Sequence, residues 1–165
     1  MTARTRAHQR AEEVLTAAMS AFAACGYTAT TADIARRAGI TQPYVLRLFG
    51  TKQSLFLAAL DRAGSRLTTA LLAIGSGEPD AAGGEPFLAE RESLLVLLHA
   101  CAAATADADI GVSTRAHFGL LYQSLQETGH TPAAARHRLA TALLVAAEAA
   151  IEPRLVGPRI EGVSD

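Results

Sequence analysis

Hydrophobic residues recur through most of this chain at the three-and-four spacing of an amphipathic α-helix. The clearest stripe, which includes Val14, Ala18 and Phe22, runs from residue 7 to residue 25 and stops before Gly26. A glycine just past such a stripe is typical of a helix end, because it adopts positive φ at no steric cost. The pattern therefore predicts a first helix over residues 7–25.

Two short helices with a turn between them are predicted next. Threonines at positions 30 and 31 can cap a helix that ends near residue 38, and Gly39 supplies the freedom for a sharp turn. Thr41 can cap the following helix, whose first turn holds Pro43, where a proline costs no helical hydrogen bond. This helix is expected to end at Phe49 and Gly50.

Longer helical patterns fill the rest of the chain. Thr51 can cap a helix that continues to Ile74, and the glycine-rich residues 75–85 are the candidate for a flexible connection. Asp107 and Thr131 are suited to cap two later helices, and the tail after Pro153 is expected to fray. The later helical patterns cover residues 87–106, 107–128 and 132–151.

Composition supports an all-α fold. Half of the 165 residues are hydrophobic but only 5% are aromatic, and the abundance of alanine favours helix over strand. We expect an N-terminal three-helix domain at residues 1–54, joined by the long helix to a small helical domain at residues 55–165.

Residues 31–50 have the spacing of a helix-turn-helix. Ile34 and Ala35 can pack inward from the first helix, and Val45 can anchor the second. The second helix of this motif enters the DNA major groove, where glutamine pairs with adenine, arginine pairs with guanine or a phosphate, and apolar surface meets a thymine methyl. The residues left facing outward for that task are Gln42, Pro43, Tyr44 and Arg47.

Four more residues complete the predicted DNA-binding set: Thr31, Arg36, Thr41 and Lys52. The threonines and the lysine lie at helix starts, where side chains and free backbone N–H groups can hold phosphates. Two arginines at positions 4 and 6 are expected on a mobile arm that follows the DNA backbone or reaches a minor groove.

The charge of the chain is unevenly distributed. The formal net charge is −1, yet residues 1–54 hold seven basic side chains against three acidic ones, and the remainder is acidic. Such a split separates an end that attracts phosphates from a body that duplex DNA would repel.

At this point the sequence resembles the TetR family of transcriptional regulators. The likeness covers residues 7–60: a first helix ending in AACGY, then T-x-x-x-IA-x-x-AGI, then ITQPYVLRLFGTKQSLF. It departs from the family pattern at Leu46 and Leu48, where many members carry an aromatic residue that touches a phosphate, and Tyr44 is a displaced substitute. The resemblance implies a ligand-responsive repressor that binds a near-palindromic operator as a homodimer.

The resemblance also implies that the last two long helices form a four-helix dimer interface. An apolar stripe on the final helix fits this role, although the core of a monomer would need the same stripe; its residues are Leu139, Leu143, Leu144 and Ala147. Pockets in helical bundles combine apolar walls with a few polar groups. The candidates for a pocket that takes a small apolar effector, which ordinary core packing would equally explain, are Leu95, Leu98, His99, Phe118 and Tyr122.

Several other functions find little support in the sequence. Cys25 and Cys101 have no ligand-spaced partners, which favours free thiols over a disulfide or a metal site. No catalytic motif is recognisable, so we expect neither an enzyme nor a cofactor. The longest uncharged apolar stretch, residues 93–106, is too short for a bilayer, and a cytoplasmic protein is expected. The alternative to a DNA-binding regulator is a helical scaffold whose basic end binds an acidic protein partner.

Overall fold

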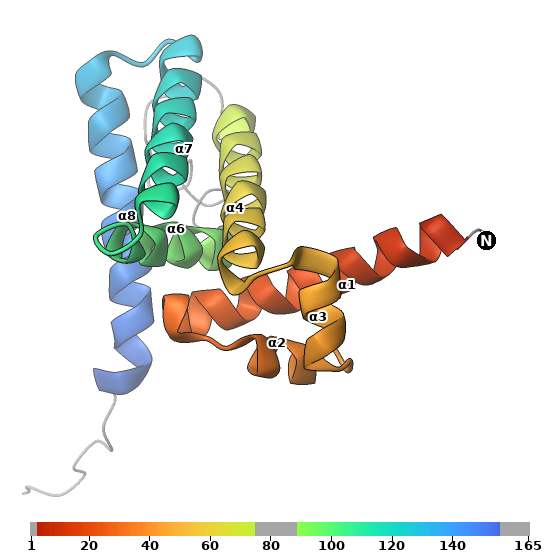
Figure 1. Ribbon diagram of the computed structural model, residues 1–165. Helices are drawn as coiled ribbons and strands as arrows, with labels where there is room; N and C mark the ends of the chain where they lie inside the picture. The colour runs from red at the N-terminus through yellow and green to blue at the C-terminus, as the bar shows by residue number, and fades with distance from the viewer. Residues whose placement is uncertain (1–2, 75–88, 156–165) are drawn as a thin grey trace, which may run out of the picture.

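The computed structural model describes residues 3–74 and 89–155, and within these ranges every regular element is a helix (Figure 1). The prediction of an all-α fold is therefore confirmed. The predicted connection at residues 75–85 and the last ten residues of the predicted tail lie outside the described residues. No helix in the described part is both long enough and apolar enough to cross a membrane.

The helices follow the predicted order closely. Their bounds are α1 Ala3–Cys25, a 3-10 turn at Gly26–Thr28, α2 Thr31–Arg37, α3 Gln42–Phe49, α4 Lys52–Ile74, α6 Arg91–Ala103, α7 Ala108–Glu127 and α8 Pro132–Leu155. Three predicted caps are confirmed by hydrogen bonds to backbone N–H groups, with the hydroxyl or carboxylate acceptors contributed by Thr51, Asp107 and Thr131.

The start of α1 differs from the prediction. The helix begins at Ala3 rather than at residue 7, so Arg6 lies on a helical turn and not on a mobile arm. Its first two turns project beyond the rest of the molecule (Figure 1), and residues 5–10 are exposed. This segment has no apolar stripe, which is why the hydrophobic pattern missed it, but alanine, arginine and glutamine are good helix formers.

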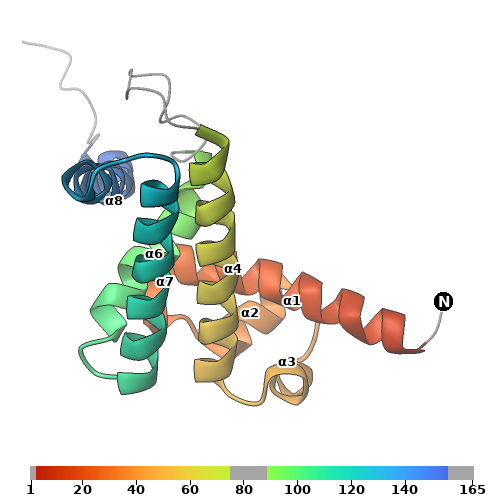
Figure 2. The same cartoon turned by 90° about the horizontal axis from the view of Figure 1, so that it is seen from above.

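The long helices pack into one bundle. Helix α4 lies against α6 and α7, and the C-terminal half of α1 packs on α4 and α6. Helix α8 packs on α6 and α7 and stands at the side away from α4 (Figure 2). Phe22 of α1 and Phe56 of α4 are fully buried and meet edge to face at 4.8 Å, so the two ends of the molecule share one core.

Helices α4 and α7 also meet through a polar contact. His117 of α7 lies so close to Gly64 that a side chain at position 64 would collide with the imidazole ring. The same ring reaches Asp61, with Nε2 at 2.8 Å from Oδ1. The absence of a side chain at Gly64 therefore allows the His117 ring to pack against α4 and to bond to Asp61, one turn earlier in that helix.

The first turn of α4 is joined to the corner between α6 and α7. Nε2 of Gln53 donates to both carboxylate oxygens of Asp107, at 3.0 and 2.8 Å, and to Asp109 at 3.3 Å. Oδ1 of Asp107 also accepts from the backbone N–H groups of Asp109 and Ile110 at the start of α7. One carboxylate thus caps α7 and holds the helix that follows α3.

Candidate nucleic-acid interface

Helices α2 and α3 form the predicted helix-turn-helix. Gly39 has φ +65° at the turn, and the backbone N–H of Ile40 bonds to the carbonyl of Ala35 at 3.0 Å. The predicted inward residues Ile34, Ala35 and Val45 are all buried. The packing predicted from the sequence is confirmed, and it fixes which side of α3 faces out.

A capping network holds the start of α2. Thr30 accepts from the backbone N–H of Asp33 at 3.1 Å, and its hydroxyl donates to Oδ2 of the same residue at 2.6 Å. Arg36 donates to the other carboxylate oxygen at 2.7 Å. The hydrogen bonds with Thr30 and, secondarily, the Arg36 charge lower the pKa of Asp33. The side chain of Arg36 remains 77% exposed, so it can still reach a phosphate.

Two predicted site residues, Thr31 and Gln42, are joined to each other. Nε2 of Gln42 donates to Oγ1 of Thr31 at 2.9 Å. Thr31 is only 8% exposed, whereas Gln42 is exposed. The threonine therefore lies beneath the glutamine and engages its amide from the protein side.

The rest of the exposed side of α3 is organised by an aromatic contact. The guanidinium carbon of Arg47 lies 4.4 Å from the centre of the Tyr44 ring, the geometry of a cation–π pair. Arg47 and Pro43 are exposed, and Tyr44 is half-buried. We call Gln42, Pro43, Tyr44 and Arg47 the recognition surface.

The remaining predicted residues surround this surface. Thr41 is exposed and occupies the cap position of α3, but its side chain makes no capping hydrogen bond. The ammonium of Lys52 donates to the backbone carbonyl of Tyr27 at 2.8 Å. The same ammonium lies 4.2 Å from the centre of the Tyr27 ring. Burial raises the pKa of Tyr27, and the nearby Asp107 charge adds to the shift. Lys52 therefore also ties α4 to the 3-10 turn that follows α1.

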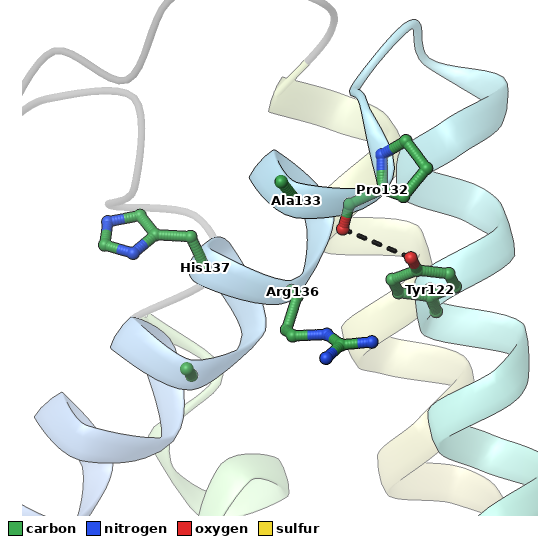
Figure 3. Close-up of a pocket in the computed structure, with 6 residues that line it drawn as sticks. Tyr122, Pro132, Ala133, Arg136 and His137 are labelled. Atoms are coloured by element: carbon green, nitrogen blue, oxygen red, sulfur yellow. Dashed lines mark hydrogen bonds between the residues drawn. The ribbon is translucent and has the colours of Figure 1, made fainter.

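The predicted effector residues lie on separate surfaces. Leu95 lines a recess between α1 and α6, the ring of His99 lies against Gly26, and Leu98 is half-buried. Phe118 and Tyr122 line a groove of about 520 Å³ between α7 and α8. The Tyr122 hydroxyl donates to the carbonyl of Pro132 at 3.1 Å in the adjoining pocket (Figure 3).

The predicted stripe on α8 is divided between two sides of the helix. Leu139 is 9% exposed and Leu143 packs partly against the core, whereas Leu144 is 58% exposed. An outward seam at alternating steps of three and four residues runs through His137, Ala140, Leu144, Ala147 and Ile151. Sequence reasoning missed this register because α8 carries alanine and leucine on all sides.

Comparison with known proteins supports the helix-turn-helix directly. Residues 14–59 match the family model described as bacterial regulatory proteins, tetR family. The comparison with curated proteins gave no match.

Solved structures share the fold over nearly the whole chain. A transcriptional regulator from Rhodococcus sp. RHA1 superposes with a TM-score of 0.69 at 22% identity, covering 90% of this chain and 87% of that one. A TetR-like transcriptional regulator from the same organism gives 0.60 at 24%, covering 86% and 82%. A putative TetR-family regulator from Mesorhizobium loti gives 0.55 at 17%, covering 90% and 98%.

The buried anchors, the turn at Gly39 and the polar outward side of α3 define a DNA-binding helix-turn-helix protein. In residues 14–59 the chain matches the helix-turn-helix model of the tetR family of bacterial regulatory proteins.

Proposed function

We propose that this protein is a ligand-responsive repressor that binds a near-palindromic DNA operator as a homodimer. The observation that carries the proposal is the recognition surface, whose polar side chains face outward from a helix anchored by Val45. The basic balance of residues 1–54 supports an approach to phosphates.

Each residue of the interface has a proposed role. Gln42 reads a base edge, Arg47 contacts a guanine or a phosphate, and Pro43 with Tyr44 offers apolar surface to a thymine methyl. Of the four residues predicted from the sequence to hold phosphates, we propose that role for Arg36 and Thr41, whose side chains are exposed. Arg36 also bonds to Asp33, but its side chain remains 77% exposed. Thr31 and Lys52 are less exposed, and they bond to Gln42 and to the carbonyl of Tyr27.

The proposed dimer uses the exposed sides of α7 and α8. Val112 and Leu120 of α7 are 64% and 54% exposed, and Leu144 and Ile151 of α8 are 58% and 52% exposed. The sides adjoin, because Gly119 and Ala140 line the same groove. We call these two sides the outer face. Large exposed apolar surfaces mark interaction sites in soluble proteins.

A glycine in the middle of α7 supports the same proposal. Glycine destabilises a helix interior by roughly 0.5–1 kcal/mol relative to alanine, and a Cβ at Gly119 would have no neighbour within 4 Å. A second helix crossing there would use that gap. An antiparallel crossing of two α7 helices at Gly119 would place Arg115 of each copy opposite Gln123 of the other. Glu127 of the other copy would lie one turn further on, where its charge is opposite to that of Arg115.

The proposed response to an effector is a population shift between two spacings of the recognition helices. In the operator-bound state these helices fit successive major grooves, about one helical turn of DNA apart. Helix α4 is the proposed lever, and the contact of Gln53 with Asp107 joins its first turn to the α6–α7 corner. The proposed effector is a small apolar molecule.

Selection of bound duplexes from random DNA tests the proposal, and a near-palindromic consensus is expected. Affinity for that consensus should fall by orders of magnitude between low and moderate salt, because phosphate contacts release counterions. Arg47→Ala should weaken binding, whereas Arg66→Ala, a matched change at an exposed position of α4, should not. The absence of salt-dependent binding to any duplex would favour the scaffold alternative, in which the basic end binds an acidic protein.

A further inference from the structure

The hydrogen bond between Thr31 and Gln42 fixes which atoms of the glutamine amide face away from the protein. Nε2 points to the buried threonine hydroxyl. A hydroxyl can either accept or donate, so the opposite orientation, with Oε1 toward Thr31, is chemically possible. The direction of this one bond decides what Gln42 offers to a base.

With Nε2 held by Thr31, the amide presents one remaining N–H and the carbonyl Oε1. One donor beside one acceptor complements adenine, whose major-groove edge offers N7 as acceptor and the N6 amino group as donor. The reversed amide would turn both N–H donors of Nε2 outward, and donors complement O6 and N7 of guanine. The observed orientation therefore distinguishes between the two purines.

Thr31 is available for this role because its neighbour caps α2. Thr30 accepts from the backbone N–H of Asp33 and donates to its carboxylate. The hydroxyl of Thr31 is thus not needed at the helix start, and it bonds instead to Gln42 on the next helix, eleven residues along the chain.

We infer that Thr31 is a positioning residue for base recognition, whose hydroxyl orients Gln42 so that it selects adenine at one position of each operator half-site. This inference rests on the DNA-binding function proposed above. An amide held in advance also loses less side-chain entropy when it is ordered on DNA.

The test compares Thr31→Val, which keeps the branched shape but removes the hydroxyl, with Thr31→Ser, which keeps the hydroxyl. Gln42→Ala first locates the position that the glutamine reads, by competition binding of the full-length protein to single-base variants of the selected duplex. Wild-type protein should prefer adenine there. Thr31→Val should reduce the preference roughly three- to tenfold, the scale of one hydrogen bond, while Thr31→Ser retains it.

Two controls separate positioning from other roles. Thr31→Val should leave the affinity for unrelated duplexes and the salt dependence unchanged, and it should add nothing in a Gln42→Ala background. Gln42→Glu, which leaves Thr31 intact, is a second test of the adenine preference. A carboxylate offers only acceptors, so the adenine preference must fall.

Three results would overturn the inference: a wild-type preference for guanine at that position, an unchanged adenine preference in Thr31→Val, or an equal loss on every sequence. The last, with a salt slope reduced by about one contact, would assign Thr31 to a phosphate. A wild-type protein with no affinity for duplex DNA would instead refute the proposed function, and the inference with it.

Discussion

The recognition surface and the outer face expose opposite kinds of side chain. On the recognition surface, two polar side chains are held by neighbours within the subunit, Gln42 by Thr31 and Arg47 by Tyr44. On the outer face, apolar side chains such as Leu144 are more than half exposed. The polar side chains of the recognition surface are therefore held in place within one chain, whereas the apolar side chains of the outer face are exposed.

This difference indicates how the two surfaces contribute to binding. A preorganised polar surface loses little entropy when it meets a ligand of matching donors and acceptors. An exposed apolar face gains free energy simply by being covered, and its specificity must come from shape. If the two ends of the molecule are also separate in stability, a substitution at one end should leave the other end folded.

The largest expected effect is at the shared core. Phe56→Ala should lower the free energy of unfolding by about 3–5 kcal/mol, because Phe56 is fully buried between Phe22 and Tyr27. Denaturant unfolding measures the loss, and hydrogen exchange should show α1 and α7 losing protection together. Protection that persisted in α7 would make the two ends independent folding units.

The next effect is at the junction between the ends. Asp107→Ala removes the cap of α7 and the acceptor for Gln53, and should cost about 1–3 kcal/mol in a thermal or denaturant melt. Gln53→Ala, which leaves the cap intact, should cost less. Equal losses in the two variants would mean that the interhelical bond, and not the cap, carries the stability.

A smaller effect with opposite signs is expected at the outer face. Gly119→Ala should stabilise the folded chain by roughly 0.5–1 kcal/mol and raise the dissociation constant of the proposed dimer, measured by sedimentation. Gly111→Ala is the matched control on α7, because the atoms nearest to a Cβ there belong to Ala104 and lie at ordinary contact distance. If both changes weakened the proposed dimer equally, the two helices would not cross at Gly119.

The smallest effect concerns the cap of α2. Because the folded pKa of Asp33 is depressed, its stabilisation is present above the pKa of an unfolded aspartate, about 3.9, and is lost as the pH falls through the folded value. Asp33→Asn should therefore be less stable than wild type at neutral pH, with the difference vanishing in acid. Urea midpoints across pH measure this, and a difference independent of pH would exclude the carboxylate charge as its source.

The sequence predicts the local structure well because local structure depends on neighbours in the chain. The helix ends, the turn at Gly39 and the inward positions of α2 and α3 follow from capping residues, glycine and apolar spacing. The predicted outward residues of α3 are exposed or half-buried in the structure. No partner distant in sequence is needed for these interpretations.

Contacts between distant segments were not predictable in the same way. The bond of Gln53 to Asp107 joins residues 54 positions apart, and no local pattern indicates it. The register of α8 was hidden for a different reason. With apolar residues on all sides, spacing alone does not separate the inward Leu139 from the outward Leu144.

The exposure of Cys25 at the end of α1 makes spectroscopic distance measurement possible without engineered attachment points. Cys101 is half-buried, and burial raises the pKa of its thiol, so less of it is the reactive thiolate at neutral pH. A brief reaction with a maleimide spin label should therefore mark Cys25 selectively. In a twofold assembly, the distance between the two labels, measured with and without DNA, would report the separation of the two DNA-binding ends.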